Sequence, residues 1–189
     1  MAAGGDHHYL FFFGDDFAPS RFWIEQALVL FESSPDIVGI SGRVISAKPG
    51  PSACALEAPT LELRQGLSGR HLALRRAAVG AIWYDETLPA GDCLADDDFC
   101  ARIARRGRVG WSPQMVGVKL DGKNERESGR PIGRSQIVNA AYLARKGSLS
   151  LQFSLEYMAR NLLSNALRAL WPEPNIDRRG RLLGNVQIP

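Results

Sequence analysis

The sequence predicts an α/β fold, because short apolar runs typical of buried strands alternate with longer amphipathic segments typical of helices. The clearest strand is residues 9–13, a short aromatic run that ends in acidic residues. The clearest helix is residues 150–170, where apolar side chains recur at spacings of three and four. With 189 residues and 45% hydrophobic content, the chain can bury a sizeable core.

The first half of the chain is predicted to alternate strands with short helices. After the strand at residues 9–13, a helix is expected at residues 20–33 with Ser20 as its N-cap. A Ser-Ser-Pro-Asp segment at residues 33–36 should end this helix. The other elements predicted here are strands at 37–40 and 43–46 with a kink at Gly42, a loop at 48–52, a strand pair at 66–74 and a helical turn at 75–81.

The second half is predicted to be mainly helical. Residues 117–134 are polar and rich in Gly and Arg, which predicts a loop. Residues from Glu173 onward are expected to be irregular. The regular elements predicted in this half are a helix at 98–106, a strand at 109–111, and helices at 135–146 and 150–170, the last ended by Trp171-Pro172.

The charges of the chain are unevenly distributed. Residues 1–99 contain 7 Lys or Arg against 14 Asp or Glu, whereas residues 100–189 contain 16 against 6. The basic half is therefore suited to a phosphorylated ligand, a nucleic acid or an anionic membrane surface. Its aromatic residues are not interleaved with Arg as in stacking platforms, so we expect no nucleic-acid partner.

The cysteines and the first residues indicate a cytoplasmic protein. Three cysteines without any C-x-x-C spacing predict neither a disulfide framework nor a zinc site. The first residues lack the basic and apolar regions of a secretory signal, and no stretch approaches the roughly 18 apolar residues needed to span a bilayer. We therefore expect a cytoplasmic location, either in solution or at the inner face of the membrane.

Two acidic clusters are candidate site residues. Asp15 and Asp16 directly follow the strand at residues 9–13, and Asp96–Asp98 stand at the head of a predicted helix. A buried strand that ends in acidic residues places carboxylates at the carboxyl edge of an α/β sheet, where ligands bind. The same residues also suit an ordinary turn and an ordinary charged helix start.

Four motifs follow one another along the chain. They are Phe13-Gly14-Asp15-Asp16-Phe17-Ala18-Pro19, Gly69-Arg70-His71-Leu72-Ala73-Leu74-Arg75-Arg76, Tyr84-Asp85-Glu86-Thr87-Leu88, and Asp96-Asp97-Asp98-Phe99 with Arg102 and Gly107. In this order and spacing they resemble the motifs of family-2 inverting glycosyltransferases of the GT-A fold. The resemblance covers residues 9–147 and implies a partial GT-A mixed sheet with a helical C-terminal extension.

The resemblance implies transfer of a sugar, with inversion, from a nucleotide-sugar donor to a polysaccharide, lipid-linked or protein acceptor. Such a reaction needs a base for the acceptor hydroxyl and a positive group for the leaving diphosphate. By resemblance, Asp96 is the catalytic base and Asp16 the metal ligand. The other implied contacts are donor or diphosphate binding by Asp15, Asp16, Lys119 and Arg130, and acceptor binding by Gly69, Arg70 and Asp98, the last alternatively a helix cap.

Three positions depart from the family pattern. Gly14 stands where the first Asp of Asp-x-Asp is expected, Ala95 where a Glu is expected, and Lys119 where a His usually completes the metal shell. A protonated Lys cannot bind a divalent ion, but it can neutralise a diphosphate. We therefore expect a Mg²⁺ or Mn²⁺ cofactor to be bound weakly or to be dispensable.

Only eight residues precede the strand at residues 9–13, whereas the family's sheet begins much earlier. We therefore expect residues 1–147 to be a partial GT-A domain that lacks most of the nucleotide-binding half, followed by a C-terminal helix and tail at 148–189. A fragment, a missing half supplied by another chain, and a degenerate relative all fit. The alternative function is a non-catalytic module that binds a partner or a membrane surface. An exposed sheet edge would favour a homo-oligomer.

The helix predicted at residues 150–170 carries an apolar stripe flanked by Arg160 and Arg168. We expect this stripe to pack on the chain's own sheet. The alternative is an interfacial helix that makes a peripheral membrane contact near a lipid-linked acceptor. The stripe consists of Leu151, Leu155, Met158, Leu162, Ala166 and Leu170.

Overall fold

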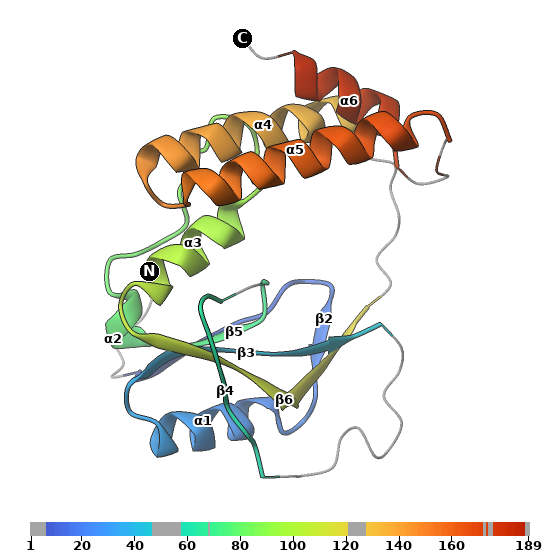
Figure 1. Cartoon of the computed structure of the whole chain (residues 1–189). Coiled ribbons are helices and arrows are strands. Elements are labelled where there is room, and N and C mark those ends of the chain that lie inside the picture. Colours follow the sequence, from blue (N-terminus) through green and yellow to red (C-terminus); the bar gives the residue numbers. More distant parts are fainter. Residues whose placement is uncertain are drawn as a thin grey trace. The chain divides into compact units, whose positions relative to one another are not determined.

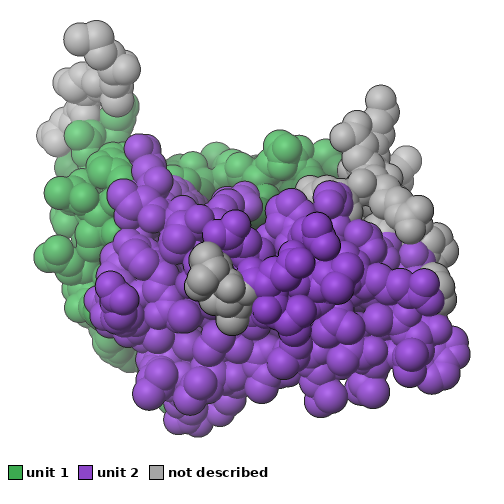
Figure 2. Space-filling view, turned by 90° about the horizontal axis from the view of Figure 1, so that it is seen from above, with its two compact units in different colours: residues 1–83, 100–122 green, residues 84–99, 123–189 purple. Residues whose placement is uncertain are grey.

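The computed structural model describes residues 7–46, 58–67, 69–120, 128–171, 173 and 176–187. The chain forms two compact units, coloured separately in Figure 2. Unit 1 comprises residues 1–83 and 100–122, and unit 2 comprises residues 84–99 and 123–189. The predicted α/β class is confirmed, because a mixed sheet and helices are both present (Figure 1). The predicted domain boundary at residue 147 falls inside unit 2.

Unit 1 is built on a mixed sheet, which the described residues form with six strands in the order β1-β5-β3-β6-β2, with β4 also paired to β6. Strands β3 and β6 are parallel, and β5 runs antiparallel to both of its neighbours, β1 and β3. Consequently β1, β3 and β6 all point the same way. The strands are β1 Tyr9–Phe12, β2 Phe17–Pro19, β3 Ile37–Ile45, β4 Glu62–Arg64, β5 Leu72–Arg75 and β6 Arg108–Lys119.

Helix α1, Trp23–Ser33, supplies much of the core of unit 1. Its buried apolar residues, Trp23, Ala27, Leu30 and Phe31, follow the spacing of one helical face. They pack with apolar residues of the sheet, including Ile37, Ile40, Ala73 and Met115. A short helix, α2 Arg76–Val79, follows β5 where the helical turn was predicted.

Three predictions for unit 1 are corrected by the structure. Ser20 is not an N-cap, because α1 begins at Trp23 after Phe22, and no side chain caps it. The strand predicted at 109–111 is much longer and runs to Lys119, so the loop predicted at 117–134 is wrong at its start. Instead of a strand pair within 66–74, the structure has β4 before this range and β5 at its end.

Unit 2 is mainly helical. Helix α3, Ala95–Ala104, begins three residues earlier than predicted. Its first residues belong to unit 2 and its last residues to unit 1. The other helices of unit 2 are α4 Gly129–Lys146, α5 Leu151–Arg168 and α6 Arg178–Val186. Ser150 caps α5 by accepting a hydrogen bond from the Phe153 backbone N–H at 3.1 Å. No described helix is long and apolar enough to cross a membrane.

The glycines of α4 and α6 explain why the start of α4 and the whole of α6 were not predicted from the sequence. The sequence suggested a loop up to residue 134 and an irregular segment after Glu173, but α4 begins at Gly129 and α6 follows Asp177. A methyl group at Gly129, Gly133 or Gly184 would collide with backbone atoms at the start of α6 or in the facing helix. These glycines therefore permit close helix packing rather than breaking the helices.

Side-chain amides fill the interior between α4, α5 and α6. Asn165 donates to Gln136 at 3.1 Å and to Asn185 at 2.8 Å, which joins the three helices. Gln136 also donates to Asn161 at 2.9 Å, and Asn185 donates to the Gly133 carbonyl at 2.7 Å. The amide groups satisfy one another, so this interior is polar and still well bonded.

The polar interior reverses the expected orientation of α5. Its buried residues are Ser154 and Asn165, whereas most of the predicted apolar stripe is exposed. Leu151 is 65% exposed and Leu155 is 53% exposed. The expectation that this stripe packs on the chain's own sheet is therefore wrong, because hydrogen-bonding amides take the inward positions instead.

Candidate functional site

The first group of predicted site residues lies in unit 1, in the turn that connects β1 with β2. The Phe17 backbone N–H donates to the Gly14 carbonyl at 3.1 Å, which closes the turn around Asp15 and Asp16. The Gly14 N–H donates to Nδ1 of His71 at 3.3 Å, and the rings of Phe17 and His71 stack with centroids 3.7 Å apart. These contacts fix the acidic turn against the start of β5.

Lys119 reaches the same turn from the end of β6. Its ammonium nitrogen lies 3.7 Å from a carboxylate oxygen of Asp16, and the Leu120 N–H donates to the Asp16 carbonyl at 2.7 Å. Both side chains are substantially exposed, so the ion pair contributes little to stability. The pair nevertheless places a cation beside the acidic turn, where an anionic ligand could bind it.

Gly69 and Arg70, the predicted acceptor contacts, precede His71 and lie close to the turn. A Cβ atom on Gly14 would come within 3.7 Å of Cβ of Arg70, so Arg70 is a direct neighbour of the turn. Gly69 has a φ of 89°, in the region that favours glycine. Unit 1 thus gathers Asp16, Arg70 and Lys119, which are far apart in the sequence, around one turn.

The donor atoms at this turn do not fit a resident divalent ion. The carboxylate predicted to bind metal, Asp16, is paired with the ammonium group of Lys119, and Nδ1 of His71 already accepts the Gly14 N–H. In the described parts of the chain, no group of three or more His, Cys, Asp or Glu side chains could hold a metal ion. The chemistry of this turn suits phosphate oxygens better than a cation.

We therefore expect calorimetric titration of Mn²⁺ into the chain, without nucleotide, to show no binding tighter than roughly millimolar. The physical reason is that the turn offers only Asp15 and Asp16, the latter beside an ammonium group, whereas a hard cation prefers several oxygen ligands. Asp16→Asn serves as the matched variant and should give the same titration. Micromolar affinity in the unaltered chain that is lost in Asp16→Asn would contradict this prediction.

The second group of predicted residues lies at the head of α3, in unit 2. Asp96 is half-buried, and the Tyr84 hydroxyl donates to its Oδ1 atom at 3.0 Å. The Tyr84 ring stacks on Phe99, with centroids 4.7 Å apart, and this holds the hydroxyl in place. Next to it, the pKa of Asp97 is raised, first by desolvation of its carboxyl group and then by the charge on Asp96. The helix head therefore presents an oriented carboxylate.

Asp98 has a different environment from the one that its sequence position suggested. It is the fourth residue of α3, so the prediction that it caps the helix is wrong. It is fully buried, and Nζ of Lys146 lies 3.4 Å from its Oδ1 atom. Asp98 therefore joins the head of α3 to the end of α4, while its acceptor contact stays a prediction.

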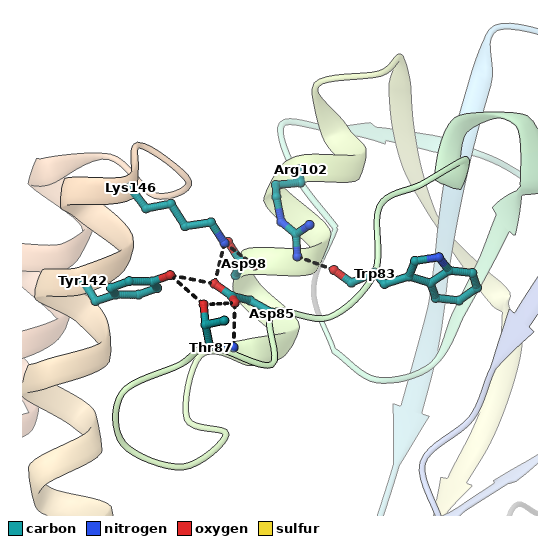
Figure 3. Close-up of polar contacts among 7 residues, drawn as sticks. All are labelled: Trp83, Asp85, Thr87, Asp98, Arg102, Tyr142 and Lys146. Carbon is teal, nitrogen blue, oxygen red and sulfur yellow. Dashed lines mark hydrogen bonds and ion pairs between the residues drawn. The ribbon is translucent and has the colours of Figure 1, made fainter.

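Lys146 also binds Asp85, which lies at the centre of the polar cluster drawn in Figure 3 with Thr87 and Tyr142. Its Nζ lies 2.6 Å from Oδ2 of Asp85, and Tyr142 donates to the same oxygen at 3.2 Å. The hydroxyl and the backbone N–H of Thr87 both donate to Oδ1 of Asp85, at 2.6 and 2.9 Å. The hydrogen bond from Lys146, followed by those from Thr87, holds the pKa of Asp85 well below its usual range. Figure 3 shows Lys146 and Tyr142 reaching from α4 towards Asp85.

Asn139 fastens the rest of the segment that precedes α3. Its side-chain oxygen accepts the Ala90 N–H at 3.0 Å, and its amide nitrogen donates to the Ala90, Gly91 and Cys93 carbonyls at 3.0, 3.1 and 2.9 Å. No sequence motif indicated that Asn139, Tyr142 and Lys146 support the site. Their spacing of three and four places them on one face of α4, and polar residues that recur at this spacing are the signal that could have indicated them.

Arg130, the remaining predicted contact of the diphosphate, lies in unit 2. It is an exposed residue in the first turn of α4, beside a pocket of about 800 Å³ within unit 2. The segment Pro89–Asp92 and the side chain of Arg134 also line this pocket. The structure thus brings Asp16, Arg70 and Lys119 together in unit 1. Asp96 and Asp98 lie together in α3, and Arg130 lines a pocket of unit 2.

Comparison with known proteins gives no family assignment. No protein-family model matches the chain, and no curated protein matches its sequence significantly.

Proposed function

We propose that this chain is the acceptor-side part of a GT-A-type inverting glycosyltransferase, which moves a sugar from a nucleotide-sugar donor to a glycan or lipid-linked acceptor. The observation that carries the proposal is the gathering of Asp16, Arg70 and Lys119 at one turn. Asp16 and Arg70 belong to two motifs of the resemblance, and Lys119 stands where the family pattern expects a His. A turn with two cations beside carboxylates suits the binding of a sugar diphosphate.

The form of the sheet supports the same proposal. A GT-A domain has a mixed sheet, and in this chain β5 is an antiparallel strand between the parallel strands β1 and β3. The acidic turn follows the carboxyl end of β1, and Lys119 lies at the carboxyl end of β6. Ligands of α/β sheets bind outside the carboxyl ends of parallel strands.

In the proposed reaction, the acceptor hydroxyl oxygen attacks the anomeric carbon while the bond from that carbon to the diphosphate oxygen breaks. Asp96 takes the proton of the attacking hydroxyl, as a positioned general base does. The hydrogen bond from Tyr84 orients its carboxylate. Lys119 and Arg70 stabilise the negative charge that develops on the leaving diphosphate.

Lys119→Met tests the assignment of the diphosphate contact. Removal of an ammonium group that binds phosphate oxygens costs about 1.5–3 kcal/mol, so the affinity for pyrophosphate should fall at least about tenfold. Titration calorimetry measures this affinity, and a coupled assay measures nucleoside diphosphate release from UDP-, GDP- and dTDP-sugars supplied with glycan and lipid-phosphate acceptors.

Arg64→Met is the matched control, because Arg64 is also an exposed cation of unit 1 but pairs with Glu62 on β4. It should leave pyrophosphate affinity unchanged. Equal losses in both variants would show that binding reflects general charge and would remove Lys119 from the site. If no donor releases nucleoside diphosphate and pyrophosphate does not bind, the proposed function is wrong.

A second candidate is a non-catalytic module that keeps the glycosyltransferase architecture. It is favoured by the Lys119–Asp16 pair, in which the carboxylate expected to bind metal is bound to an ammonium group instead. The same experiments separate the two candidates. A module would bind pyrophosphate through Lys119 without turnover of any donor, whereas an enzyme would show both.

A further inference from the structure

We propose that α5 is a membrane-surface helix, which lies in the plane of an anionic lipid bilayer with its leucines in the outer part of the acyl region. This proposal does not depend on sugar transfer. It starts from the reversed orientation of α5, whose buried residues are Ser154 and Asn165. The helix turns Ser154 and Asn165 into unit 2 and its leucines outward, while Met158 packs against the apolar cluster around Leu143.

The outward face of α5 is largely apolar. Around the helix axis, its leucines fall on one broad face, where Gln152 and Glu156 are the main polar interruptions. A contiguous exposed face of this kind marks an interaction site rather than ordinary surface. The exposed leucines are Leu151, Leu155, Leu162, Leu163, Leu167 and Leu170, with exposed fractions from 40% to 68%.

The face cannot simply turn inward, because the opposite side of α5 is fixed by hydrogen bonds. Asn165 binds Gln136 of α4 and Asn185 of α6, and Asn161 accepts from Gln136. Rotation of α5 to bury its leucines would break these hydrogen bonds and leave the amides exposed or buried without partners. The outward position of the leucines is therefore built into the packing of the three helices.

The charges around the helix select the partner. Residues 128–187 contain nine Arg or Lys against three Asp or Glu. Two copies of such a cationic bundle would repel each other, whereas anionic lipid headgroups would attract each one. On α5 itself, Arg160 is exposed at the edge of the apolar face, next to Leu167 around the helix axis. A cation at the border of an apolar face suits a helix that lies at an anionic membrane surface.

Aromatic residues lie at both ends of the same helix. Phe153, in the first turn, is 39% exposed, and Trp171, just after the last turn, is 71% exposed. Aromatic side chains favour the boundary between headgroups and acyl chains, so they would anchor both ends of α5 at one depth. The helix has 18 residues and is therefore about 27 Å long, which provides an extended contact parallel to the bilayer.

Co-sedimentation of the full chain with lipid vesicles tests the proposal. Vesicles of phosphatidylcholine with 30% phosphatidylglycerol, roughly the anionic content of a charged membrane surface, are compared with pure phosphatidylcholine at low and physiological salt. We expect binding to the anionic vesicles that weakens as salt screens the arginines. The double variant Leu155→Asp, Leu163→Asp should reduce this binding at least about tenfold, because charged groups replace apolar contact area.

The matched control is Ile24→Asp, Val29→Asp, which introduces the same charges at two exposed apolar positions of α1 in unit 1. It should bind anionic vesicles like the unaltered chain. The variant Arg160→Glu, Arg168→Glu should lose binding to anionic vesicles without a change in helix content. Circular dichroism verifies that each variant is folded, and all the substituted leucines are exposed, so folding should survive.

Several results would overturn the proposal. One is that the unaltered chain fails to bind anionic vesicles even at low salt, and another is that it binds neutral vesicles equally well. A third is equal loss of binding in the α1 control. A concentration-dependent dimer in sedimentation velocity, abolished by the leucine variant in the absence of vesicle binding, would instead assign the face to a second copy of the chain.

Discussion

Asp96→Asn is expected to lower kcat by about 10²–10⁴-fold, because an amide cannot accept the proton of the attacking hydroxyl. The fold should persist, since the Asn oxygen can still accept the hydrogen bond that Tyr84 donates at 3.0 Å. Steady-state kinetics with the nucleotide-sugar that gives the highest turnover would measure the effect. Thermal unfolding followed by circular dichroism would verify that the variant is folded.

Asp97→Asn is the natural control, because Asp97 carries the neighbouring carboxylate in the same helical turn. It removes one negative charge from the same place without removing the oriented carboxylate. Its kcat should stay within a fewfold of the original value. Unchanged turnover in Asp96→Asn, or an equal loss in both variants, would show that Asp96 is not the base.

Lys146→Met is expected to lower the free energy of unfolding by about 2 kcal/mol at pH 7. Loss of one partner of a buried ion pair commonly costs about 3–5 kcal/mol. We expect less because the Lys146 side chain is 30% exposed, so the pair is only partly desolvated, and because Asp85 keeps its hydrogen bonds from Thr87 and Tyr142. Urea unfolding measures the difference, and Arg145→Met, at an exposed position next to it in α4, should change stability by less than about 0.5 kcal/mol.

The pH dependence of the Lys146 variant gives an independent test. The pKa of Asp85 is below its ordinary value of 3.8 in the folded chain, so its interactions stabilise the fold above that pH. This contribution is lost as the pH falls from about 4 towards the lower folded-state pKa. The stability gap between the unaltered chain and Lys146→Met should therefore narrow below about pH 4. A gap that stays constant down to pH 2 would show that the cluster contributes no charge interaction.

The sequence predicted elements whose apolar face packs on an apolar core. The strand at residues 9–13 and the body of α1 were predicted closely, because aromatic and aliphatic residues mark the side that is buried. Apolar patterning did not predict the interior between α4, α5 and α6 in unit 2, which contains hydrogen-bonded amides and closely packed glycines. Helix α6 has few apolar residues and was expected to be irregular, yet Asn185 and Gly184 hold it against α4.

For the candidate site, the sequence indicated individual residues but not the contacts between them. Motif order selected Asp16 and Arg70, and the expected position of a family His selected Lys119; the fold brings these three residues to one turn. Motif order was not enough to identify Lys146 as the partner of Asp98, because these residues are 48 positions apart and no pattern links them. Contacts between distant residues depend on how helices cross, and a single sequence carries little information about that geometry.

The discontinuous path of the chain has a consequence for its synthesis. Residues 84–99 of unit 2 leave the ribosome before β6, the strand that pairs with β2, β3 and β4 in unit 1. The carboxylates of Asp85 and Asp98 therefore lack their partner until Lys146, at the end of α4, has been synthesised. The amide of Asn165 on α5 lacks Asn185 until α6 has been synthesised. Domains that form from one continuous segment can fold as they emerge. In this chain, a nascent polypeptide that stalls before residue 129 would already contain Asp96, but not α4, the helix that holds the preceding segment in place.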